Sequence, residues 1–72
     1  MTGELERLVG FGRLLRARGL PVGTGRILSF CRAVAVLDPI TTENLYWAAR
    51  STLISTKQHL DVFERCFDLY FG

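Results

Sequence analysis

The segment Gly19-Leu-Pro-Val-Gly-Thr-Gly25 constrains the fold of this chain more than any other stretch. Inside a helix, glycine is about 1 kcal/mol and proline about 3 kcal/mol less favourable than alanine, so a helix must end before this segment. Asp38-Pro39 makes a second break, because the residue before a proline avoids the helical region. The chain is therefore divided into short pieces, and its fold class depends on the hydrophobic pattern of each piece.

Each piece carries apolar residues at the helical period of about 3.6, and none alternates apolar and polar residues as a half-buried strand does. We expect helices over residues 3–17, 25–37, 42–54 and 56–71. The predicted fold class is all-α: a compact bundle of four short helices, arranged as two helical hairpins. A chain of 72 residues forms one domain at most, here residues 1–72.

The glycines are expected to have local roles. Gly12 lies within the apolar stripe of the first helix, where the missing side chain allows a second helix to approach closely. Gly19 is expected to end that helix in the left-handed region, and Pro21 then prevents its continuation. Gly23 and Gly25 are expected to let the chain reverse into the second helix.

Polar residues at the breaks are typical of helix starts. Thr24 is the expected N-cap of the second helix, and Thr41 or Thr42 that of the third. Ser55 and Gln58 have the spacing of a capping box at the start of the fourth helix.

The apolar content is large for such a short chain. Hydrophobic residues make up 49% of the sequence, whereas a domain of this size buries only about 60% of the surface that its unfolded chain exposes. Some apolar surface is therefore expected to remain for a partner. Two pairs of apolar residues, each seven apart on one helix, face away from the core stripes. Either these helices are enclosed on both sides within the bundle, or the pairs form a protein interface, and we predict the interface. These residues are Trp47 and Ile54 on the third helix and Val62 and Leu69 on the fourth.

Positive charge is concentrated in the first half of the chain. Residues 1–32 have a net charge of +4, and residues 33–72 have a net charge of −2. Arg16, Arg18 and Arg26 surround the start of the second helix, so they form a candidate anion patch. The alternative is a solvated loop whose arginines pair with the acidic later helices. A nucleotide site is not expected, because a helix rather than a strand precedes the glycines and their spacing fits neither nucleotide-binding motif.

No residue set in the chain amounts to a catalytic site, so we expect no enzyme activity, no metal and no cofactor. Cys31 and Cys66 lack a paired spacing and a nearby histidine pair, and both are expected to be buried reduced thiols. His59 lacks partners and is expected at the surface. No apolar run approaches the roughly 20 residues that span a bilayer, and no leader pattern is present. We expect a soluble, cytoplasmic protein with no membrane contact.

Two long segments resemble the N-terminal part of VWA domain-containing CoxE-like proteins. They are LVGFGRLLRARGLPVGTGRILSFCRAVAVLD, from Leu8 to Asp38, and YWAARSTLISTKQHLDVFERCFDLYF, from Tyr46 to Phe71. In that family, the resemblance implies, a helical segment precedes a von Willebrand factor A domain with a D-x-S-x-S metal site. Such proteins act with a MoxR-type AAA+ ATPase in maturing other proteins, including metalloenzymes such as carbon monoxide dehydrogenase. This chain contains no D-x-S-x-S, so the metal site does not carry over.

The resemblance implies a helical adaptor role for this chain. It places that role at Arg16, Gly19, Pro21, Gly23, Trp47, Arg50 and the helix that carries Phe63 and Phe67. We therefore expect a non-enzymatic protein-interaction module whose partner is a VWA domain, an AAA+ ATPase or a second copy of itself. The alternative function is a small nucleic-acid- or anion-binding helical domain that uses Arg16, Arg18 and Arg26.

Overall fold

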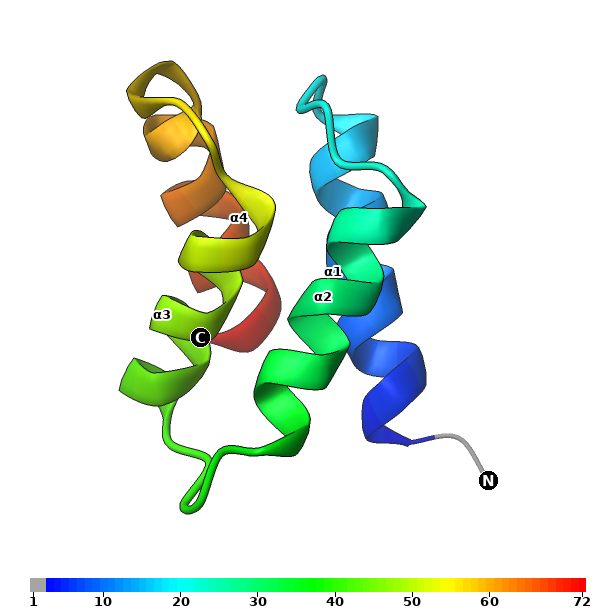
Figure 1. Ribbon diagram of the computed structural model, residues 1–72. Coiled ribbons are helices and arrows are strands. Elements are labelled where there is room, and N and C mark those ends of the chain that lie inside the picture. Colours follow the sequence, from blue (N-terminus) through cyan, green and yellow to red (C-terminus); the bar gives the residue numbers. More distant parts are fainter. Residues whose placement is uncertain (1–2) are drawn as a thin grey trace.

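The computed structural model describes residues 3–72 and contains four α-helices joined by short loops (Figure 1). They are α1 (Glu4–Ala17), α2 (Thr24–Ala35), α3 (Thr42–Leu53) and α4 (Leu60–Phe71), and a short 3-10 turn, η1 (Lys57–His59), precedes α4. The most extensive helix contact is between α2 and α3; α1 packs against both α2 and α4, and α3 has a smaller contact with α4 (Figure 1). The described residues contain no strand, so the predicted all-α bundle is confirmed. No helix among them is long and apolar enough to cross a membrane.

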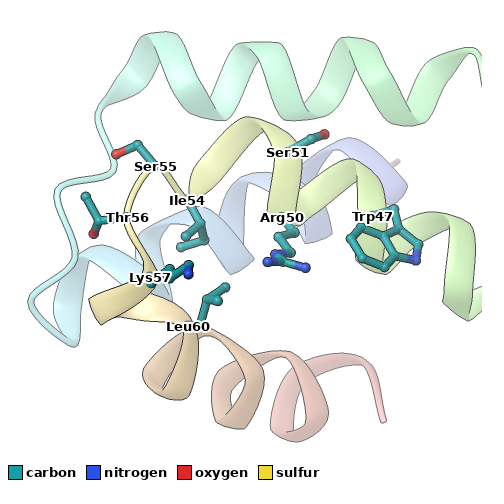
Figure 2. Close-up of a pocket in the computed structure, with 8 residues that line it drawn as sticks. All are labelled: Trp47, Arg50, Ser51, Ile54, Ser55, Thr56, Lys57 and Leu60. Carbon is teal, nitrogen blue, oxygen red and sulfur yellow. The ribbon is translucent and has the colours of Figure 1, made fainter.

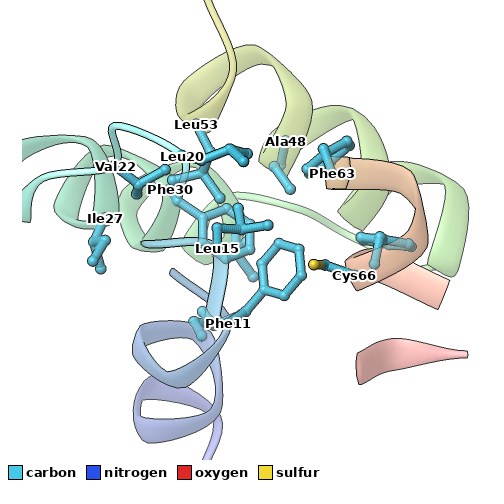
Figure 3. Close-up of a cluster of buried hydrophobic side chains, with 14 residues drawn as sticks. Phe11, Leu15, Leu20, Val22, Ile27, Phe30, Ala48, Leu53, Phe63 and Cys66 are labelled. Carbon is cyan, nitrogen blue, oxygen red and sulfur yellow. The ribbon is translucent and has the colours of Figure 1, made fainter. Parts of the chain in front are cut away.

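Phe11 of α1 lies at the centre of the core and is completely buried. Its ring centroid is 4.9 Å to 6.1 Å from those of Phe30 of α2 and of four aromatic residues of α4, namely Phe63, Phe67, Tyr70 and Phe71. Aromatic pairs at such separations stabilise a fold beyond the area they bury. Figure 3 shows the Phe11 ring pointing from α1 toward Cys66 of α4. One side chain of the first helix thus joins three of the four helices.

Glycines on both sides of Phe11 allow the neighbouring helices to come close. A Cβ atom on Gly12 would lie 2.5 Å from Cγ1 of Ile27 in α2, closer than real Cβ contacts occur. A Cβ atom on Gly10 would collide with the hydroxyl of Tyr70 in α4, which donates a hydrogen bond of 2.8 Å to the Arg7 carbonyl. The close approach predicted at Gly12 is confirmed, whereas the second one, at Gly10, was not predicted.

The loop after α1 closes with a Schellman motif. Gly19 has a φ of 94°, its N–H donates to the Arg16 carbonyl at 3.0 Å, and the Leu20 N–H donates to the Leu15 carbonyl at 3.1 Å. This pattern satisfies the last carbonyls of the helix and brings an apolar residue back onto it. The left-handed conformation predicted for Gly19 is confirmed. The loop is not wholly solvated, however, because Leu20 and Val22 are both buried in the core.

The predicted role of Gly23 and Gly25 is wrong. Neither has a positive φ, and a Cβ atom on either would meet no atom within 4 Å. The chain enters α2 in ordinary extended geometry, with a φ of −91° at Gly23, which any residue adopts.

Only one of the three predicted helix caps is formed. The Thr41 hydroxyl accepts a hydrogen bond of 3.0 Å from the Asn44 N–H, as expected. Thr24 is the first residue of α2, and Gly23 occupies the N-cap position without a side-chain bond. The capping box of Ser55 and Gln58 is absent, because η1 lies at this position and α4 begins four residues later than expected, at Leu60.

We predict that Gly12→Ala lowers the free energy of unfolding by about 1–3 kcal/mol, because overpacking must push α1 away from the buried Ile27. Gly25→Ala is the matched control: its methyl group meets open space, and because alanine is favoured over glycine in a helix by about 0.5–1 kcal/mol, this variant should not be destabilised.

A larger side chain at the same position extends the test. Gly12→Leu is expected to be more destabilising than Leu14→Ala, although Leu14 is half-buried. Urea midpoints check this order. Equal midpoints for the two alanine variants would mean that α1 and α2 are not in close contact.

Candidate functional site

A groove of about 290 Å³ lies between the outer face of α3 and the segment that leads into α4 (Figure 2). It is lined by Trp47, Arg50, Ser51, Ile54, Ser55, Thr56, Lys57 and Leu60. Pockets that hold small molecules measure about 300–1,000 Å³, so this groove is at the lower limit of that range.

The helical repeat of α3 explains why four of these residues share a face. Arg50, Ser51 and Ile54 follow Trp47 at the spacings +3, +4 and +7, which lie on one side of a helix. Figure 2 shows Ile54, which directly follows α3, close to Lys57 and Leu60, with Arg50 and then Trp47 farther along the helix. The opposite side of α3 supplies the core residues Ala48, Ala49 and Leu53. This helix therefore has a core face and a separate outward face.

Trp47 is exposed but held in position. Its side chain is 51% exposed. The Tyr46 ring meets it nearly edge-on, with the centroids 5.2 Å apart, and the guanidinium carbon of Arg50 lies 5.1 Å from its ring centroid. A cation over an indole ring is attracted by the ring electrons. These two contacts orient the indole before any partner arrives, which lowers the entropy that binding must remove.

A hydrogen bond beside the groove connects α3 with α4. The Tyr46 hydroxyl donates to Oε2 of Glu64 at 2.7 Å. This hydrogen bond, together with burial and the charge of Glu64, raises the pKa of Tyr46, while the charge of Arg50 opposes that rise. Arg50 is thus close enough to influence this hydroxyl from the groove side.

The structure brings together only half of the predicted interface. Trp47 and Ile54 line the groove, but Val62 and Leu69 do not. Leu69 is nine residues from Leu60, which places it about half a turn away around α4. It is 75% exposed, whereas Val62 is half-buried against the core. The interface role of these four residues stays a prediction, and the geometry divides them into the Trp47 groove and a separate patch at Leu69.

Sequence reasoning missed the part of the groove that lies outside α3. Ser55, Thr56 and Lys57 belong to the connection and to η1, and they carry no periodic signal. Leu60, the first residue of α4, is half-buried against the core and also lines the groove.

Two arginines of the candidate anion patch hold main-chain carbonyls. Nε of Arg16 donates to the Val22 carbonyl at 2.9 Å, and Nη1 of Arg26 contacts the Leu53 carbonyl at 3.4 Å. The first bond braces the loop after α1, and the second connects the start of α2 with the end of α3. Arg18 is exposed. The structure thus gives Arg16 and Arg26 partners in the main chain, and anion binding stays a prediction.

The remaining titratable candidates are scattered. Cys66 is buried, Cys31 is half-buried, and both are free thiols; burial raises the pKa of Cys31. His59 is half-buried, and its Nδ1 lies 3.0 Å from the Thr56 hydroxyl. Within residues 3–72, no group of three histidine, cysteine or acidic side chains is placed to hold a metal ion.

We predict that Arg16→Ala lowers the free energy of unfolding by about 1 kcal/mol, the usual net value of one hydrogen bond, because the Val22 carbonyl loses its donor. Arg18→Ala removes the same charge two residues away and is expected to change stability by less than about 0.5 kcal/mol. Urea unfolding compares the two variants. Equal effects would show that Arg16 acts only through its charge.

We also predict a pH-dependent role for Tyr46. Folding raises the pKa of the Tyr46 hydroxyl above its usual value of about 10. The contribution of the protonated hydroxyl to the free energy of unfolding is therefore fully present below about pH 10 and is lost as the pH rises through the pKa of the folded state. At neutral pH, the free energy of unfolding of the wild type is expected to be about 0.5–1 kcal/mol higher than that of Tyr46→Phe. This difference should become smaller at alkaline pH.

Urea unfolding over a neutral-to-alkaline series measures this difference. Glu64→Gln is the matched control, because its amide oxygen still accepts the bond but carries no charge, so the alkaline loss should be smaller. A difference between wild type and Tyr46→Phe that stays constant in alkali would contradict the assignment.

The comparisons with known proteins agree with this architecture. The sequence model of the CoxE N-terminal helical bundle domain matches residues 8–72. No curated protein and no solved structure gives a match. The matched segment contains most of α1 and all of α2, α3 and α4. The chain belongs to the family of CoxE N-terminal helical bundle domains.

Proposed function

We propose that this domain is a non-enzymatic adaptor that binds another protein through the groove beside Trp47. The observation that carries the proposal is the state of Trp47, which is half exposed and yet held by Tyr46 and Arg50. Tryptophan and arginine are enriched among the residues that dominate binding energy at protein interfaces. A large, oriented aromatic side chain next to a groove is the expected form of such an anchor.

The family supports the choice of partner. CoxE-like proteins, which this chain resembles, combine a helical segment with a VWA domain and act with MoxR-type AAA+ ATPases in maturing metalloenzymes. We therefore infer that the groove docks the domain onto such a VWA domain or ATPase. Self-association through the same groove is the competing outcome, and the experiment below separates the two.

The nucleic-acid alternative has less support. Two of its three candidate residues, Arg16 and Arg26, already contact main-chain carbonyls. The net charge of the whole chain is only +2. Affinity for nucleic acids depends on several cations that contact successive phosphates. Of the three arginines in the patch, only Arg18 has a side chain with no main-chain carbonyl partner among residues 3–72, and one arginine is too few for such binding.

We predict that Trp47→Ala weakens partner binding by roughly 30-fold, the effect of losing a 2 kcal/mol anchor. The variant should still fold with a nearly unchanged thermal midpoint, because half of this side chain is already in solvent. Calorimetric titration with the purified ATPase and VWA domain measures binding, and light scattering measures self-association.

Val36→Ala is the matched control, because Val36 is 80% exposed and does not line the groove. It should leave both binding and folding unchanged. Unaltered binding by Trp47→Ala, or failure of that variant to fold, would remove the groove as the docking surface.

A further inference from the structure

The groove beside Trp47 is positively charged. Its lining residues, all within the part of the chain that the structure describes, include the cations Arg50 and Lys57 and no carboxylate. Ser51, Ser55 and Thr56 also line it, although the Ser51 hydroxyl donates to the Ala48 carbonyl of its own helix and the Thr56 hydroxyl contacts His59. Residues 33–72 have a net charge of −2, so this local excess of positive charge runs against the charge of the surrounding chain.

The same groove has an apolar side. Trp47, Ile54 and Leu60 line it, and the last two are only half-buried. Figure 2 shows Ile54 and Leu60 near Lys57, with Arg50 between Ile54 and Trp47 along the helix. A ligand that fills this groove must therefore cover apolar carbon and meet two positive charges at once.

Arg50 is suited to receive a carboxylate. A guanidinium that lies over an aromatic ring still carries N–H donors around its edge, and these match the two oxygens of a carboxylate. Arg50 is half-buried, so its charge is less screened by water than that of a fully exposed arginine. The carboxylate of Glu64 accepts a bond from Tyr46 and is not part of the lining.

We propose that the groove takes an acidic peptide segment of the partner, with one large apolar side chain against Trp47 and a neighbouring carboxylate between Arg50 and Lys57. This inference rests on the proposed function of the groove as a docking surface and adds the chemistry of what docks there. A nucleic acid is the less favoured occupant, because two cations beside a pocket of about 290 Å³ offer no track for successive phosphates.

The test is a selection of random short peptides displayed on phage against the purified chain. Enriched sequences should combine aspartate or glutamate with a large apolar residue nearby. Synthetic copies of the enriched peptides are then titrated, and Trp47, the only tryptophan of the chain, reports binding through its fluorescence. The affinity should fall with added salt, because exposed charge pairs are screened. Neutral or basic enriched sequences, or no enrichment, would overturn the proposal.

Matched double variants locate the charge effect. Arg50→Gln with Lys57→Gln should weaken binding by roughly 2- to 30-fold, the combined effect of two partly exposed ion pairs. Arg13→Gln with Arg32→Gln removes the same charge from exposed positions on α1 and α2 and should leave the affinity unchanged. Equal losses from both double variants would show a general charge effect and overturn the assignment to the groove.

Two further probes separate this inference from the proposed function. The probes are oligothymidine and phosphatidylserine-containing vesicles, and the Arg50 and Lys57 double variant should not change the binding of either one. If the double variant weakens binding of the oligonucleotide or of the vesicles, that ligand replaces the acidic peptide as the proposed occupant. If Trp47→Ala abolishes partner binding while the Arg50 and Lys57 double variant does not, the docking surface stands and only the acidic chemistry fails. If neither variant affects partner binding, the docking surface itself fails.

Discussion

The packing of Phe11 against aromatic rings of α2 and α4 is the contact on which the rest of this bundle depends. Its ring is completely buried, and its neighbours in sequence, Gly10 and Gly12, have no side chains that would keep other helices away. Ile27 of α2 fills the space over one glycine, and the Tyr70 hydroxyl fills the space over the other. A short helix buries little surface against any one neighbour, so it must pack against several. Through the three consecutive residues Gly10, Phe11 and Gly12, α1 packs against both α2 and α4.

Much of this fold follows from the sequence, because its helices are amphipathic and its breaks contain strong helix terminators. The end of α1, the start of α3 and the left-handed Gly19 follow from local rules, and the close approach at Gly12 follows from its place in the apolar stripe. What escaped prediction depends on tertiary contacts. Leu20 and Val22 are buried only because the Schellman motif folds the loop back onto the core.

The groove was predictable only in part for the same reason. The spacing of Trp47 and Ile54 places them on one outward face of α3, and this was visible in the sequence. Lys57 and Leu60 join them because the chain makes the turn η1 before entering α4, and a three-residue turn has no period to detect. The expected link to Val62 and Leu69 does not form the same groove, since α4 presents Leu60 to α3 and Leu69 to another side.

The hydrogen bond from Tyr70 to the Arg7 carbonyl joins residues that are 63 positions apart. Closing a loop of this length carries an entropy cost that a contact within one helix does not. On a ribosome, α1, α2 and α3 emerge before the aromatic residues of α4 that surround Phe11. Until α4 is made, Phe11 lacks the four aromatic residues of that helix that surround it, so the growing chain exposes apolar surface that is prone to aggregation.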